Sequence, residues 1–146
     1  MTTLHRAAVV PYSAEEMYKL INDIDSYPRF LPWCTNTKVL QRTDEEVVAT
    51  IELAAAGMHK SFTTQNKLTP NYRIEMHHKE GPFKHLSGTW TLEPLASGGC
   101  EVLLDLDFEV HSGIAGMVFG MLYNKVADKL VESFSTRATE LYGPKV

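Results

Sequence analysis

Histidines and cysteines are the residues of this chain best suited to acid–base, nucleophilic or metal chemistry, and there are six of the first and two of the second. His77 and His78 are consecutive, so in a strand they point to opposite faces and cannot easily bind one metal ion. His59 and His77 could meet on one face, but the sequence offers no third ligand, and structural zinc sites take four. We therefore predict no metal site.

Cys34 and Cys100 are the candidate nucleophiles. The sequence has no G-x-S-x-G motif, no P-loop and no G-x-G-x-x-G motif after a strand. A Cys–His pair at Cys34 stays an open alternative. We favour the other interpretation, in which each cysteine is a small buried thiol that packs like an apolar side chain. The sequence thus predicts no catalytic residue and no enzymatic activity.

Three polar side chains on otherwise apolar strand faces are the remaining candidates: Thr64, Asn66 and His78. A buried polar group without a partner costs about 1–3 kcal/mol. These groups therefore bond to one another, to water or to the backbone, or they supply the few oriented donors of an apolar pocket. A quinone or a similar head group with carbonyl oxygens would fit such a pocket.

Strands are the elements that must position these side chains. Polar and apolar residues alternate through five stretches between Val47 and Val110, which indicates an antiparallel sheet with one face in water. Two further strands are predicted at Leu4 to Val10 and Thr37 to Gln41. Within the middle strands, Tyr72 is expected to face inward and Thr63 outward.

Two helices are also predicted. Ser13 and Glu16 form a capping-box pattern before an apolar stripe, and this helix is expected to continue until Pro28, because the residue before a proline avoids the α region. Tyr27 to Cys34 is predicted as a short helical turn plus a loop. A helix from about Gly113 to Tyr142 closes the chain, amphipathic in its second half and apolar nearly all round in its first.

These elements predict one α+β domain over residues 1–146. A curved antiparallel sheet cannot bury its concave face alone, whereas a long helix laid across it can. The space between them is then either packed core or a cavity, and we interpret it as a cavity for an apolar ligand. Residues 27–33, the turn at 80–84 and the apolar start of the last helix are its expected rim; ordinary core closure is the alternative.

Composition limits the partners. The net charge of −4 gives no general reason to expect nucleic-acid binding, and no DNA partner is predicted. Two cysteines without a secretion-signal pattern favour reduced thiols in the cytoplasm. The longest apolar run, Ile114 to Tyr123, has about half of the roughly 20 residues that a membrane-spanning helix needs.

A basic region lies between His59 and His85, with five cationic residues against two acidic ones. Such a surface could bind ribosomal RNA or anionic lipid head groups; an ordinary solvated face is the alternative. The predicted anion-binding residues are Lys60, Lys67, Lys79 and Lys84.

Three segments, VPYSAEEMY, YPRFLPWC and GPFKHLSGTW, carry a resemblance that extends over nearly the whole chain. The sequence resembles the ribosome association toxin A group of the coenzyme Q-binding, START-like (helix-grip, polyketide cyclase/SRPBCC) family. The resemblance implies a helix-grip fold, in which about seven antiparallel strands wrap around the long C-terminal helix and enclose a hydrophobic tunnel.

Two functions follow from the resemblance. The first is non-enzymatic binding, transport or chaperoning of ubiquinone or a related polyprenyl quinone in support of respiration, with no required cofactor. The alternative is inhibition of ribosome association through the large ribosomal subunit. Either function fits a cytoplasmic protein, and the first adds transient contact with the inner membrane surface.

The candidate ligand-binding residues combine those that the resemblance implies with the inward-facing strand positions. They are Tyr27, Pro28, Phe30, Leu31, Trp33, Phe62, Thr64, Asn66, Met76, His78, Phe83, Leu86, Trp90, Leu106, Phe108, Val118 and Leu122.

Overall fold

The computed structural model describes residues 2–55 and 57–144, so residues 1 and 146, the limits of the predicted domain, lie outside the described residues. The helical elements are α1 (Ala14–Asn22), the 3-10 helix η1 (Ile24–Arg29) and α2 (Ile114–Tyr142). The strands are β1 (Thr2–Val10), β2 (Cys34–Arg42), β3 (Glu46–Ala55), β4 (Met58–Thr69), β5 (Arg73–Glu80), β6 (Phe83–Pro94) and β7 (Cys100–Val110).

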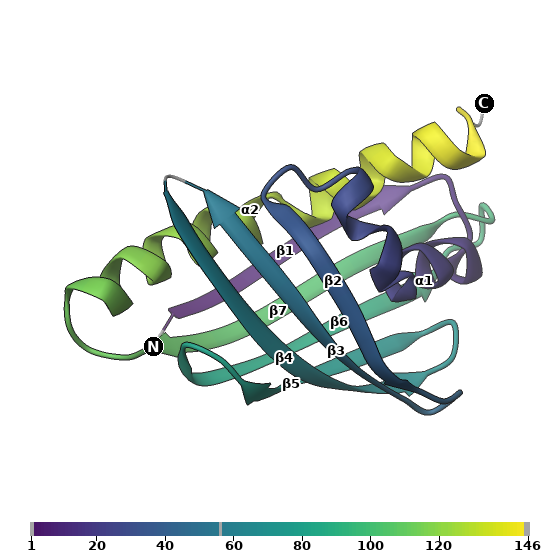
Figure 1. The fold of residues 1–146 in the computed structure, drawn as a ribbon. Helices are drawn as coiled ribbons and strands as arrows, with labels where there is room; N and C mark the ends of the chain where they lie inside the picture. Colours follow the sequence, from purple (N-terminus) through teal and green to yellow (C-terminus); the bar gives the residue numbers. More distant parts are fainter. Residues whose placement is uncertain (1, 56, 145–146) are drawn as a thin grey trace.

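The seven strands form one antiparallel sheet in the order β1-β7-β6-β5-β4-β3-β2. Strands β2 to β7 follow one another as hairpins, whereas β1 pairs with β7 at the far edge. The sheet curves, and α2 lies along its concave side (Figure 1). This architecture confirms the predicted α+β class and the curved sheet around a long C-terminal helix. The weak strand predicted from Thr37 begins three residues earlier, at Cys34.

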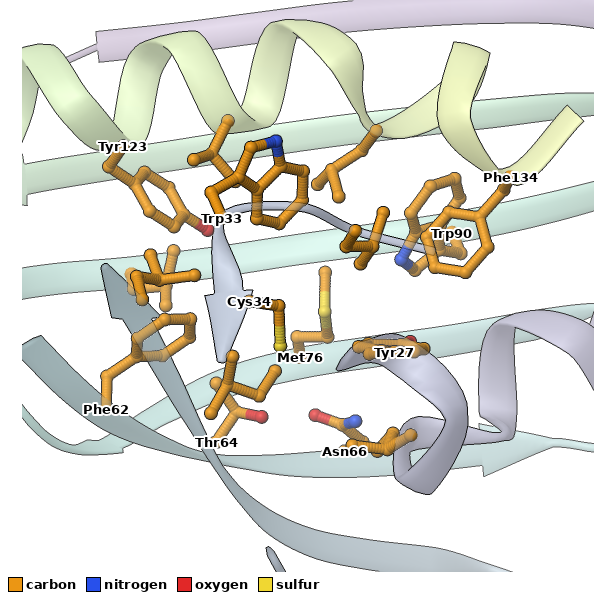
Figure 2. A pocket seen from close by; sticks show the side chains of 17 residues that line it. Tyr27, Trp33, Cys34, Phe62, Thr64, Asn66, Met76, Trp90, Tyr123 and Phe134 are labelled. Atoms are coloured by element: carbon orange, nitrogen blue, oxygen red, sulfur yellow. The ribbon is translucent and has the colours of Figure 1, made fainter. Parts of the chain in front are cut away.

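The long helix does not lie over the middle of the sheet. Its backbone is closest to β1 and β7, and Arg6 of β1 binds Asp128 of α2 with an Nη2–Oδ1 distance of 2.6 Å. The half of the concave face that β2 to β5 form is therefore not covered directly by the α2 backbone. Side chains from α2 and η1 face it instead (Figure 2).

An aromatic cluster fills the concave face near the start of α2. The ring of Phe83 makes edge contacts with Phe62, Phe119 and Tyr123 at centroid distances of 5.5, 5.1 and 4.8 Å. Phe108 packs against Tyr123 at 4.9 Å. Edge-to-face rings at such distances attract one another beyond their burial of apolar area. This end of the domain is consequently solid core.

The first helix begins as predicted but ends earlier. The Glu16 N–H donates to Ser13 Oγ at 3.1 Å, and the Ser13 N–H donates to the Glu16 carboxylate at 3.0 Å, which confirms the capping box. The helix stops at Asn22, and the predicted continuation up to Pro28 is wrong. Residues 24–29 form η1 instead, with Pro28 inside it.

Replacing Ser13 by alanine should lower the free energy of unfolding by about 1 kcal/mol, because the Glu16 N–H loses its side-chain acceptor, the Ser13 hydroxyl oxygen. Urea denaturation followed by circular dichroism measures this loss. Ser13→Asp is the matched control, since aspartate also accepts at the N-cap position. Equal stability of the alanine variant and the parent protein would show that the cap contributes nothing.

Two positions differ from what the alternation predicts, Thr63 in its burial and Tyr72 in its orientation. Thr63 lies on the convex face, as predicted, but it is buried, and its hydroxyl shares a hydrogen bond of 2.7 Å with the Thr50 hydroxyl. Tyr72 is exposed, so its predicted inward orientation is wrong. It belongs to the turn before β5, where its N–H donates to the Thr69 carbonyl at 3.0 Å and Asn71 has a φ of 72°.

The first turns of α2 carry an exposed apolar surface. Ile114, Met117 and Met121 are 81, 64 and 65% exposed, whereas Phe119 on the opposite side is buried in the aromatic cluster. A Cβ atom at Gly116 would lie 1.8 Å from the His111 carbonyl oxygen, so glycine is required where the helix starts. No helix among the described residues combines the length and hydropathy that crossing a membrane requires.

Candidate functional site

A cavity lies between η1, the concave face of β2 to β6 and the middle turns of α2 (Figure 2). Its volume is about 70 Å³. The residues that line it are Ile24, Tyr27, Leu31, Trp33, Cys34, Ile51, Leu53, Phe62, Thr64, Asn66, Met76, Leu86, Trp90, Tyr123, Val126, Leu130 and Phe134.

The α2 side of the cavity follows from helical spacing. Tyr123, Val126, Leu130 and Phe134 recur every three or four residues, so they share one face of the helix. Phe134 closes the end near η1 and contacts the rings of Tyr27 and Trp90, both at 5.3 Å. The amphipathic half of the helix therefore supplies one complete wall.

None of these seventeen lining side chains is charged at neutral pH. The Tyr27 hydroxyl donates to the Ile21 carbonyl oxygen, which fixes the ring in the wall. Burial raises the pKa of Tyr27 and Tyr123, so both phenols stay protonated. The cavity is thus an uncharged compartment, and it offers hydrogen bonds only from neutral groups.

Thr64 and Asn66 are the most polar members of the wall. They are 4 and 5% exposed, and they sit two residues apart on the inner face of β4. The Asn66 Oδ1 atom is buried and has no hydrogen-bond partner among the described residues. His78, the third polar candidate, pairs with Thr64 in the sheet, but its ring packs on Phe83 at 5.7 Å and does not line the cavity.

Nine of the seventeen predicted ligand-binding residues line the cavity, and their contact with a ligand stays a prediction. The nine are Tyr27, Leu31, Trp33, Phe62, Thr64, Asn66, Met76, Leu86 and Trp90. The other eight lie elsewhere, namely Pro28, Phe30, His78, Phe83, Leu106, Phe108, Val118 and Leu122.

The position of α2 explains why some of these eight residues do not line the cavity. Because α2 lies over β1 and β7, the inward side chains of β7, Leu106 and Phe108, are buried beneath the helix and away from the cavity. Val118 is 45% exposed on the first turns of α2. Phe30 does not line the cavity. Its ring packs on that of Phe134, and the Arg137 guanidinium lies 5.2 Å from the centre of the Phe30 ring. The start of α2, predicted to be part of the rim, contributes no residue before Tyr123 to the lining of this cavity.

Eight lining residues were not predicted from the sequence: Ile24, Cys34, Ile51, Leu53, Tyr123, Val126, Leu130 and Phe134. The signal for most of them was present. Ile51 and Leu53 lie on the apolar face of their strand, and the four α2 residues lie on the apolar stripe of the helix. The patterns showed which faces point inward, but not which part of each face borders the cavity.

Cys34 is a cavity residue without nucleophilic character. Its thiol is buried and lies 3.9 Å from the Asn36 carbonyl oxygen. Burial raises the pKa of Cys34 to about 11, and it raises the pKa of Cys100 to about 11 as well. A thiolate is the reactive form of cysteine, and no histidine lines the cavity. This geometry weighs against the Cys–His alternative.

The raised thiol pKa values predict a loss of stability in alkali. In the unfolded chain the thiols ionise near their ordinary pKa of 9, but in the folded protein only near 11. The unfolded state therefore releases protons first, and the stability present below pH 9 should decline from pH 9 to pH 11. Buried tyrosines add to the decline above pH 10.

Urea denaturation at pH 8, 9, 10 and 11 measures this decline. A variant with both Cys34→Ala and Cys100→Ala is the matched control, and it should lose the part of the decline that begins at pH 9. An unchanged pH profile in that variant would contradict the assignment.

The four lysines predicted to bind anions are all exposed, but the fold does not bring them to one surface. Lys60 lies opposite Leu53, whose side chain is buried on the concave face, and directly paired residues share a face. Lys60 therefore lies on the concave side of the sheet, near the beginning of β4. Lys79 lies between His78 and Glu80 of β5, at the point where the register with β4 shifts, so it is paired with no residue of β4.

The other two lysines are next to carboxylates. Lys67 on the convex face is paired with Glu46 of β3 and with Glu75 of β5. Lys84 Nζ lies 3.6 Å from the Glu109 carboxylate of β7. The charges of Lys67 and Lys84 are consequently balanced locally, and the basic region of the sequence is not one continuous basic patch.

The fold and its cavity define a START-like, helix-grip protein with an internal apolar site. Residues 10–135 match the family described as polyketide cyclase / dehydrase and lipid transport, and the chain belongs to this family.

The relatives extend the family assignment to the whole chain. The chain is 41% identical to the ribosome association toxin RatA of Escherichia coli (strain K12), over 99% of this chain and 92% of the relative. It is 25% identical to coenzyme Q-binding protein COQ10 homolog B, mitochondrial, of Xenopus laevis, over 92% of this chain and 57% of the relative. The ZhuI aromatase/cyclase of Streptomyces has the same fold, with a TM-score of 0.82, 16% identity and 94 and 93% of the two chains covered.

Proposed function

We propose that this protein binds an uncharged, largely apolar ligand in the cavity, namely ubiquinone or a related polyprenyl quinone, and carries or protects it without catalysing a reaction. The single observation that carries the proposal is the composition of the cavity wall. It is apolar and uncharged, and it presents the neutral polar side chains of Thr64, Asn66 and Tyr123.

The wall selects against charged ligands. A carboxylate or phosphate in this cavity would lose its water without meeting a cationic side chain, at a cost of several kcal/mol. An isoprenoid tail gains about 25 cal/mol for each Å² of apolar surface removed from water. A neutral ring with oxygen substituents and a hydrocarbon tail therefore fits better than a fatty acid or a phospholipid.

The relatives support the same ligand class. The Xenopus laevis relative is named as a coenzyme Q-binding protein, and the matching family is described as including lipid transport. The Escherichia coli relatives point to a different function, which is treated as a second candidate below.

The present volume of about 70 Å³ is well below the roughly 300 Å³ of a small ligand pocket. The cavity must therefore enlarge when a quinone ring enters. Trp33 is only half buried and lies in the segment between η1 and β2. We place the opening there, because residues 30–33 lie outside the strands. Their movement would break the hydrogen bond with the sheet from the Ala54 N–H to the Trp33 carbonyl oxygen.

Lipid identification tests the carrier function. Protein purified without detergent is analysed by native mass spectrometry, and its extract is searched for quinones. A short-tailed ubiquinone is then added, and the melting temperature is measured. We expect a co-purified quinone and a raised melting temperature, as for any ligand that binds only the folded state. If no quinone is recovered and the melting temperature does not move, the carrier function is rejected.

The second candidate is binding of the large ribosomal subunit in the cytoplasm, with inhibition of subunit joining. The observation in its favour is the likeness to RatA proteins, which extends over 99% of this chain. Under this proposal the lysines of the middle strands contact ribosomal RNA, and their separation on the fold allows them to be tested as two groups.

Co-sedimentation with ribosomal subunits tests this candidate. One variant carries Lys67→Gln, and another carries Lys60→Gln, Lys79→Gln and Lys84→Gln together. Loss of sedimentation in one of them identifies which group of lysines makes the contact. Sedimentation that is unchanged in both variants rejects these lysines as the binding surface, and absence of sedimentation of the parent protein rejects the candidate.

A further inference from the structure

The polar pair on the inner face of β4 gives the cavity a specific hydrogen-bonding demand. Thr64 and Asn66 are both more than nine-tenths buried, and Figure 2 shows their side-chain oxygens turned toward one another at the cavity wall. Residues two apart on a strand are separated by about 6.6 Å. A single ligand oxygen can lie between two such side chains and bond to both.

The unpaired atom of this pair is an acceptor. Asn66 Oδ1 is buried and has no donor among the described residues. A buried acceptor without a donor has lost its hydrogen bonds to water and gained none in return, which destabilises this arrangement. A ligand with an O–H group at this position would remove that destabilisation.

The two redox forms of a quinone differ in this respect. A quinone carbonyl accepts hydrogen bonds, so it can pair with the Thr64 hydroxyl or the Asn66 amide N–H groups, but it leaves Oδ1 unpaired. A hydroquinone hydroxyl accepts one hydrogen bond and donates another. It can therefore accept from Thr64 and donate to Asn66 at the same time.

The other lining groups leave this distinction intact. The cross-strand neighbour of Asn66 is Met76, whose thioether is only a weak acceptor. Cys34 has a buried thiol near the Asn36 carbonyl oxygen. No lining group among the described residues donates a hydrogen bond to Asn66 Oδ1 in place of the ligand.

We infer that Thr64 and Asn66 form a head-group site for a neutral ring hydroxyl, and that the cavity binds the hydroquinone form of its ligand in preference to the quinone form. This inference rests on the proposed carrier function. It assigns a redox preference to the cavity, and it requires no reaction inside the protein.

Calorimetric titration with decylubiquinone, and with decylubiquinol kept reduced under anaerobic conditions, measures the preference. We expect the quinol to bind about tenfold more tightly, which corresponds to an increase of about 30 mV in the midpoint potential of the bound two-electron couple. Equal affinities, or tighter binding of the quinone, would overturn the inference while leaving the carrier function in place. Failure of both forms to bind would reject the carrier function itself.

Two variants locate the preference. Asn66→Leu removes the acceptor, and it should bring the ratio of the two affinities to about one by weakening quinol binding more than quinone binding, because the quinone carbonyl keeps the Thr64 hydroxyl as a donor. Gln65→Leu changes a side chain of the same strand that does not line the cavity, and it should keep the ratio of the parent protein. An Asn66→Leu variant that folds and keeps the full preference would refute the assigned site. The ratio in the unaltered protein decides the redox preference even where a variant does not fold.

Discussion

Replacing Ile51 by tryptophan should lower the affinity for the ligand at least about tenfold. The variant protein should still fold. Ile51 lines the cavity from the middle of β3, where it is paired with Phe62. An indole at this position occupies the space that the ligand needs, and tryptophan is well tolerated in strands. Calorimetric titration with decylubiquinone gives the affinity, and circular dichroism confirms the fold.

The matched control is Lys38→Trp. Lys38 is exposed on β2 and paired with Thr50, so the added indole lies on the convex face. This variant should bind like the parent protein. Undiminished binding by a folded Ile51→Trp variant would place the ligand outside the cavity.

The largest expected loss of stability follows from Phe134→Ala. Phe134 is 1% exposed and its ring packs on those of Tyr27, Phe30 and Trp90, so it joins α2 to both η1 and the sheet. Removing a buried phenyl ring costs about 3–5 kcal/mol, because transfer energy is lost and a void remains. Urea denaturation with a comparison of m-values measures the change.

Phe134→Leu serves as the control, since leucine keeps most of the buried volume. It should lose less than half as much stability as the alanine variant. A loss below about 1 kcal/mol for Phe134→Ala would mean that η1 and the sheet close the gap around α2.

The sequence predicted the fold well because the patterns that define it are local. Alternation with period two placed Val102, Leu104 and Leu106 on the inner face, and all three are buried in β7. The prediction that the first helix continues until Pro28 was wrong, and the reason is also local. The Asp23 N–H donates to the Leu20 carbonyl at 3.3 Å, and the chain turns into η1, a geometry that accommodates a proline.

The site was predicted less well because it depends on how the helix lies across the sheet. Leu86 and Phe108 are opposite one another in β6 and β7, and both face inward. Only Leu86 borders the cavity. Residue periodicity defines the face of an element, but the position of α2 over β1 and β7 arises from packing among residues distant in sequence, such as Phe83 with Phe119.

The lysines show that the local charge of a surface also cannot be predicted from the order of residues in the sequence. Counting residues between His59 and His85 gave a basic region, but cross-strand neighbours such as Glu46 and Glu75 come to lie beside Lys67. Strand pairing, and not linear order, sets the local field. The sequence therefore overstated how basic the convex face is.

The pairing of β1 with β7 has a consequence for the order in which the molecule is built. His5 and its partner Asp105 are 100 positions apart, so the first strand leaves the translating ribosome long before the strand that completes it. Until then the nascent chain holds an incomplete meander whose apolar side has no cover, the kind of intermediate that chaperones bind. Structures dominated by such distant pairings form slowly. The sheet therefore stays incomplete until β7 has been translated, because β7 is the strand with which β1 pairs.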